Sequence, residues 1–149
     1  MSVNYLDVEL MEGMCHRLAV AVFDTKDDPI ASFDDREEEK LDAALNLSQQ
    51  TFDGKELYPT LVDKATILFY AINKNHAFKN GNKRISAASL MVFLFINDKW
   101  LDAGKTEIVE KTLYVARSGE PGTPKKEEVV ENIKQWIGGH IVDAPEIIF

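Results

Sequence analysis

The chain has 149 residues, 45% of them hydrophobic and 28% charged, and a formal net charge of −8. This length and composition are typical of a globular protein, and we expect a single domain over residues 1–149. The acidic balance disfavours a general nucleic-acid or anionic-membrane surface, so a bound anion would need a local basic patch. The lone cysteine, Cys15, excludes an internal disulfide and a cysteine-rich zinc site, and we expect a buried, inert thiol.

Neither a targeting segment nor a membrane span is expected. Asp7, Glu9 and Glu12 interrupt the apolar stretch near the start, which argues against a signal peptide. The longest apolar run, Leu90–Ile96, is far too short to cross a bilayer. We therefore expect a cytoplasmic protein with no membrane partner.

Apolar residues recur at helical spacing along most of the chain, with Gly, Pro and Asn at the breaks. The helix after residue 82 is apolar nearly all round, so we place it at the centre of the fold. We expect Asp34 or Asp35 to cap the second helix, and Gly138-Gly139 to follow the last one. The pattern predicts an all-α bundle of about six helices, at residues 5–23, 36–48, 60–75, 83–97, 104–116 and 126–136.

Three connecting segments complete this pattern. Residues 24–29 form an acidic break, and residues 140–149 form a tail whose packing the sequence leaves open. Between the second and third helices, Asp53-Gly54 is a hairpin signal, although its flanks are too short for a stable sheet. Pro59 marks the start of the third helix.

The acidic residues of the chain are absent from one long stretch. No Asp or Glu occurs between Asp63 and Asp98. Within it, the eleven residues from Lys74 to Arg84 carry four basic side chains and none of opposite sign. A basic patch in an acidic protein predicts a pocket for an anion.

Residues His76–Arg84 lie in this patch, where one predicted helix ends and the next begins. A helix N-terminus offers unpaired N–H groups to an anion, and Gly81 allows close approach to the backbone. Lys83 and Arg84 add positive charge in the first turn, which the helix dipole disfavours unless an anion lies in front of it. His76 can face the same anion from the preceding helix and serve as a general base. The pattern therefore predicts a phosphate site with a base beside it.

The same nine residues, HAFKNGNKR, resemble the Fic/Doc family motif H-x-F-x-[DEN]-[GA]-N-[GK]-R. Lys83 stands where classical Fic adenylyltransferases have Gly, and Ala87 stands where they usually have a second Arg. Both favour the death-on-curing (Doc) branch. The similarity covers most of the chain, through residues 41–45, 52–54, 58–61 and 64–65 upstream and, more weakly, residues 114–119 and Trp136 downstream.

The resemblance implies an all-α bundle around the motif helix and a toxin of a toxin–antitoxin pair. Doc-like toxins transfer the terminal phosphate of ATP to a Ser or Thr hydroxyl of a target protein, such as elongation factor Tu. By position, His76 would deprotonate the target hydroxyl and Phe78 would anchor the loop in the core. The phosphates would lie on Gly81, Asn82, Lys83 and Arg84, and the target would dock on a flap that includes Phe52, Asp53, Gly54 and Lys55.

One position departs from the active relatives. Their motif acid binds Mg²⁺, and its place is taken here by Asn80, whose amide oxygen can ligate the ion but adds no charge. We therefore expect weakened Mg²⁺ affinity. Two alternatives to phosphate transfer remain open: AMP transfer of the Fic type, and a metal-impaired module that binds a nucleotide or protein without catalysis.

Regulation is the last point on which the sequence bears. Many Fic proteins carry an inhibitory motif, [ST]-x-x-x-E-[GN]. Thr106–Glu110 and Thr123–Glu127 match its first five positions, but Lys111 and Glu128 fail the sixth. We therefore expect inhibition in trans by a small antitoxin, and no direct nucleic-acid partner.

Overall fold

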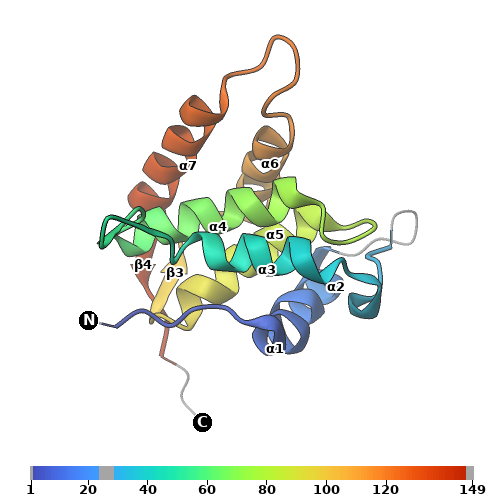
Figure 1. Ribbon diagram of the computed structural model, residues 1–149. Coiled ribbons are helices and arrows are strands. Elements are labelled where there is room, and N and C mark those ends of the chain that lie inside the picture. Colours follow the sequence, from blue (N-terminus) through green and yellow to red (C-terminus); the bar gives the residue numbers. More distant parts are fainter. Residues whose placement is uncertain (1, 24–28, 147–149) are drawn as a thin grey trace.

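A computed structural model describes residues 2–23 and 29–146, and the predicted acidic break at 24–29 lies almost wholly outside them. The chain folds as an all-α bundle with two small antiparallel sheets, which confirms the expected fold class (Figure 1). The helices are α1 (Val8–Leu10), η1 (Met11–His16), α2 (Arg17–Phe23), η2 (Phe33–Asp35), α3 (Glu38–Leu47), α4 (Leu61–Asn75), α5 (Asn82–Phe95), α6 (Lys105–Ala116) and α7 (Lys126–His140). The strands are β1 (Thr51–Phe52), β2 (Lys55–Glu56), β3 (Lys99–Leu101) and β4 (Ile141–Asp143).

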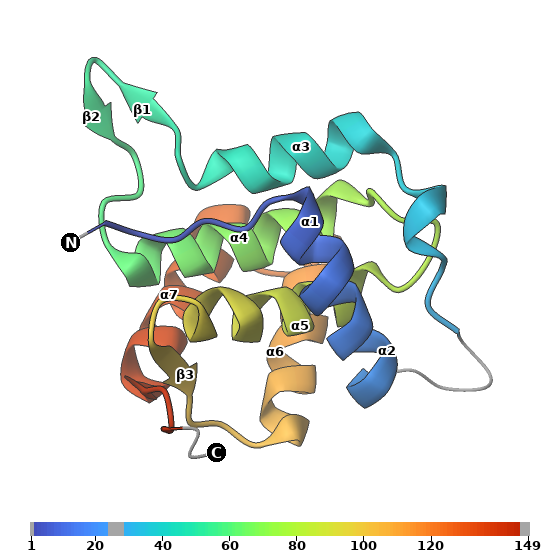
Figure 2. The same cartoon turned by 90° about the horizontal axis from the view of Figure 1, so that it is seen from below.

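Helix α5 lies at the centre of the bundle, as its nearly continuous apolar surface predicts. Every side chain from Ile85 to Leu94 is buried. The helix packs against α4, η1, α2, α6 and β3, and Figure 2 shows it between the N-terminal helices and the α6–α7 pair. The N-terminus of α5 is therefore fixed in space by elements from most of the chain.

Several predicted boundaries were wrong. The first helix begins at Val8 rather than residue 5, because Asp7 accepts a hydrogen bond from the Leu10 N–H and caps it there. Neither Asp34 nor Asp35 caps α3: both lie in η2, and α3 follows Glu37 without a side-chain cap. Gly138 and Gly139 continue α7 to His140 instead of following its end.

The tail also acquires a structure that the sequence left open. Strand β4 pairs antiparallel with β3, with Trp100 opposite Val142. At the edge of this pair, Lys99 and Asp143 form an ion pair of 2.6 Å. The pairing ties the end of α7 to the segment that leaves α5.

The β1–β2 hairpin forms around Asp53-Gly54, with only two residue pairs in register. So short a hairpin is marginal by itself. A buried lysine of α4, Lys64, supports it: its Nζ donates to the Glu56 carboxylate at 3.0 Å and to the carbonyl of Tyr58. Because Lys64 lies in the first turn of α4, the hairpin is attached at the N-terminal end of that helix (Figure 1).

Two further properties concern the whole fold. Within the described residues, no helix has the length and apolarity needed to cross a membrane. Cys15 is fully buried, and burial raises the pKa of its thiol to about 12, which agrees with the inert thiol expected from the sequence.

A capping box fixes the start of α4. The Thr60 hydroxyl accepts from the Asp63 N–H at 3.0 Å, and the Asp63 carboxylate accepts from the Thr60 N–H at 3.3 Å. Lys134 of α7 pairs with the same carboxylate at 2.9 Å. Burial raises the pKa of Asp63, but the hydrogen bonds from Lys134 and Thr60 outweigh it and lower the pKa below its usual value of 3.8.

Replacing Asp63 with Ala is expected to lower the free energy of unfolding by about 1 kcal/mol at pH 7. Because the pKa of Asp63 is lower in the folded state, this contribution is present above pH 3.8 and is lost as the pH falls through the folded value. Urea unfolding at pH 7 and at decreasing pH measures both effects. Asp42→Ala, on the exposed face of α3, is the control, and equal unfolding midpoints for D63A and wild type at pH 7 would contradict the prediction.

Candidate functional site

The turn between α4 and α5 contains two residues in the left-handed backbone region. His76 ends α4 with φ 51° and ψ 47°, and Gly81 precedes α5 with φ 84°. For a residue other than glycine this conformation is uncommon and costs on the order of 1 kcal/mol. The structure thus holds the candidate base in a strained conformation, which is common at functional sites.

The Asn82 side chain closes this turn. Its Oδ1 accepts from the Phe78 N–H at 3.0 Å, and its Nδ2 donates to the Phe78 carbonyl at 2.8 Å. The side chain is buried and used in these two bonds, so the structure gives it a different contact from the phosphate contact implied by the resemblance. Asn82 retains a backbone N–H in the first turn of α5 that could face an anion.

Phe78 fastens the turn to the N-terminal part of the chain. Its ring is buried and lies 5.7 Å from that of Phe33 and 6.1 Å from that of His16, centre to centre. A backbone bond of 2.7 Å from the Glu37 N–H to the Ala77 carbonyl adds a second attachment. The turn is therefore held both by the Asn82 hydrogen bonds within it and by these contacts with the N-terminal part of the chain.

Gly81 meets two separate constraints. Its φ of 84° disfavours any residue with a Cβ, and an added Cβ would lie 2.9 Å from Cγ2 of Ile30. Only glycine satisfies both without a shift of the neighbouring segment.

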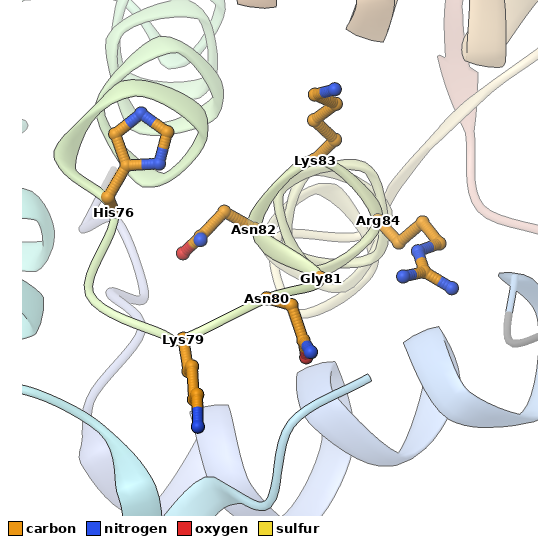
Figure 3. A pocket seen from close by; sticks show the side chains of 7 residues that line it. All are labelled: His76, Lys79, Asn80, Gly81, Asn82, Lys83 and Arg84. Carbon is orange, nitrogen blue, oxygen red and sulfur yellow. The ribbon is translucent and has the colours of Figure 1, made fainter. Parts of the chain in front are cut away.

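A cavity of about 270 Å³ opens at this turn. Lys83 and Arg84 extend from the first turn of α5 to different sides, with His76 across the loop (Figure 3). Arg84 reaches toward α2, where its guanidinium donates to the Phe23 carbonyl at 3.4 Å. The lining residues are His76, Lys79, Asn80, Gly81, Asn82, Lys83 and Arg84.

A second, larger cavity of about 610 Å³ adjoins the first, because His76 and Lys83 line both. Its other wall comes from the end of α6 and the turn that follows, including Arg117 and Glu120. Sequence reasoning assigned no role to this wall. The basic run that includes Lys74 was a signal for it, but only the fold shows that Lys74 reaches residues more than forty positions away.

The structure does not bring the predicted flap to this site. Phe52, Asp53, Gly54 and Lys55 belong to the hairpin at the N-terminal end of α4, and His76 follows its C-terminal end. Helix α4 has 15 residues, which corresponds to about 22 Å. Lys64 attaches the hairpin at the far end of the helix, and the role of these residues as a target-docking flap stays a prediction.

The donor set bears on the expected metal ion. Asn80 and Asn82 supply the side-chain amide oxygens in the lining of the smaller cavity, and no carboxylate lines that cavity among the described residues. In Figure 3, Asn80 extends from the loop in the opposite direction to Lys83. Mg²⁺ prefers carboxylates and phosphate oxygens, so these residues do not by themselves form a magnesium site.

Comparison with known sequences identifies the protein family to which this fold and this site belong. The sequence profile of the Fic/DOC family matches residues 5–94, so the chain belongs to the Fic/DOC family. A curated relative, "Toxin Doc" of Mycolicibacterium smegmatis (strain ATCC 700084 / mc(2)155), is 44% identical over 63 residues. These residues are 42% of this chain and 48% of the relative, so the chain spans about half the length of the protein it matches. No solved structure matches the chain.

Gly81→Ala is expected to destabilise the protein more than a glycine replacement that meets strain alone. Gly122→Ala is the matched control, because Gly122 has a φ of 81° and no atom within 4 Å of an added Cβ. Both variants lose on the order of 1 kcal/mol from left-handed strain, and G81A loses more through the contact with Ile30. Thermal unfolding followed by circular dichroism measures the difference, and equal losses would show that the segment around Ile30 moves freely.

Proposed function

We propose that this protein is a Doc-like toxin that transfers the terminal phosphate of ATP to a Ser or Thr hydroxyl of a target protein. The observation that carries the proposal is that His76 and the N-terminus of α5, with Lys83, line the same cavity. A general base and the N-terminus of a helix, which binds anions, face the same small cavity. This arrangement suits phosphoryl transfer, in which the protein acts chiefly by positioning and electrostatics. Membership of the Fic/DOC family and the printed name of the relative support it.

In this mechanism His76 accepts the proton of the target hydroxyl as its oxygen attacks the terminal phosphorus. The bond from that phosphorus to the bridging oxygen breaks, and ADP leaves with the electron pair. Lys83, Arg84 and the N–H groups of the first turn of α5 hold the phosphates. His76 is exposed, so a protein substrate can reach its ring.

ATP and Mg²⁺ are both part of the proposal. Because the described residues do not form a magnesium site unaided, we derive no step through the ion. The phosphates themselves would bring most of the oxygen ligands that Mg²⁺ prefers.

We propose two protein partners. One is an acceptor protein, with elongation factor Tu as the first candidate from the resemblance, and the other is a small antitoxin acting in trans. A target that contacts both the hairpin and His76 would have to span about 22 Å, the length of α4.

Incubation with a bacterial lysate and ATP labelled on either the γ- or the α-phosphate tests the reaction. Transfer from the γ position is expected, and transfer from the α position would establish AMP transfer instead. His76→Asn is the inactive control, because Asn adopts the left-handed conformation readily and preserves the end of α4. Loss of a general base is expected to lower the rate about 10²–10⁴-fold, and full activity of H76N would remove His76 from the mechanism.

Asn80 favours one alternative, a protein that binds a nucleotide without catalysis. Asn80→Asp adds the missing charge, and it is expected to tighten Mg²⁺ binding in the presence of ATP. Labelling rates over a series of Mg²⁺ concentrations measure the effect. An increase of tenfold or more would show that the natural chain is limited by its metal. Equal rates at all concentrations would show that Asn80 suffices or that the metal is not limiting.

A further inference from the structure

Three side chains of α4 hold the end of α6 against the cavity. Lys74 Nζ donates to the Ala116 carbonyl at 3.0 Å and to the Ser118 carbonyl at 2.7 Å. One turn earlier, the Tyr70 hydroxyl lies 3.1 Å from the hydroxyl of Ser118. The carbonyls at a helix C-terminus have no partners within the helix, so an ammonium group is well placed there.

The third side chain, Asn73, contacts both α6 and α5. Asn73 Nδ2 donates to the Thr112 carbonyl of α6 at 3.1 Å and lies 3.4 Å from the hydroxyl of Ser86 on α5. Asn73, Ser86 and Ser118 are buried. The wall opposite His76 is thus fixed by polar contacts, most of them made by buried side chains. Lys74, which makes two of these contacts, lies two residues before His76.

Arg117 lies between the two residues whose carbonyls Lys74 binds, and it lines the larger cavity together with His76 and Lys83. Its side chain is exposed, and among the described residues no carboxylate forms an ion pair with it. Lys83, on the facing wall, likewise has no ion pair within the described part of the chain. Two cations that have no ion pair within the described residues therefore face one cavity in a protein of net charge −8.

The charges of this cavity favour an anion longer than one phosphate. Lys74, Lys83 and Arg117 are opposed by one acidic lining residue, Glu120. A volume of about 610 Å³ is within the range of small-molecule sites, and the smaller cavity adds space beside the N-terminus of α5. A polyphosphate chain that begins at Gly81 can extend past Lys83 toward Arg117.

We infer that Arg117 is a nucleotide-binding residue that contacts the polyphosphate from the wall opposite His76, and that Lys74 is a positioning residue that holds Arg117 in place. The inference rests on the proposed function, since it assigns a further contact to the same nucleotide. A guanidinium binds phosphate oxygens in a two-pronged geometry that an ammonium cannot copy. Arg117 adds affinity for the phosphates without contacting the acceptor hydroxyl of the target.

Titration calorimetry with ATP, inorganic tripolyphosphate and adenosine tests Arg117. Arg117→Ala is expected to weaken binding of ATP and tripolyphosphate about tenfold, the loss of one charge-assisted contact, and to leave adenosine unchanged. Arg117→Lys is expected to restore part of that loss. Lys125→Ala removes an equal charge from the other end of the α6–α7 connection, and Lys125 does not line the cavity, so this variant is the matched control.

Lys74 is tested by a double-mutant cycle with Arg117. Lys74→Met keeps the aliphatic stem and removes both bonds to α6, so it is expected to weaken ATP binding in the wild type and much less in the R117A background. Equal losses in both backgrounds would mean that Lys74 acts by its own charge and would overturn its positioning role. Thermal unfolding verifies that each variant is folded.

The outcomes separate the two proposals. Wild-type protein that binds neither ATP nor tripolyphosphate would overturn the proposed function. If R117A binds ATP as tightly as the wild type does, the role of Arg117 is overturned and the proposed function is not. A loss in K125A equal to that in R117A would show a general charge effect and would also overturn it.

Discussion

The closed turn between α4 and α5 is the constraint on which the rest of the site depends. The chain leaves α4 in a left-handed conformation at His76 and enters α5 through another at Gly81. Between these two residues, the backbone of Phe78 is hydrogen-bonded to the Asn82 side chain, which closes the turn. If the turn opened, His76 and the first turn of α5 would no longer face one cavity. Much of the motif is therefore explained by geometry: Phe78, Gly81 and Asn82 hold the turn, and the proposed chemistry falls to His76, Lys83 and Arg84.

This division changes how a family motif is interpreted. A polar motif residue beside a proposed phosphate site is easily assigned to the ligand, as Asn82 was here. Its side chain makes two hydrogen bonds to one residue of the turn, Phe78, and so has a structural role as well. The proposed anion site draws chiefly on backbone N–H groups and cations, and both depend on the closed turn for their position.

Helix α4 connects the site to the rest of the molecule through its polar side chains. Near its start, Lys64 holds the hairpin, and Asp63 pairs with α7. Near its end, Asn73 and Lys74 hold α6. A helix with so many buried residues gains stability from apolar packing, but its few polar side chains decide where the neighbouring elements lie.

Local chemistry explains what the sequence by itself determined. The all-α class, the central place of α5, the hairpin at Asp53-Gly54 and the turn at residues 76–82 all follow from patterns of neighbouring residues, because apolar periodicity and turn preferences act over a few positions. Only the tertiary structure decided the features that join distant residues: the place of the hairpin, the β3–β4 pair in the tail and the wall at Arg117. A bond such as that from Lys74 to Ser118 spans 44 positions, and nothing in the local sequence specifies which distant carbonyl a lysine reaches. The packing of α6 against α4 determines this partner. It places the carbonyls at the end of α6, which have no partner within the helix, beside the ammonium group of Lys74.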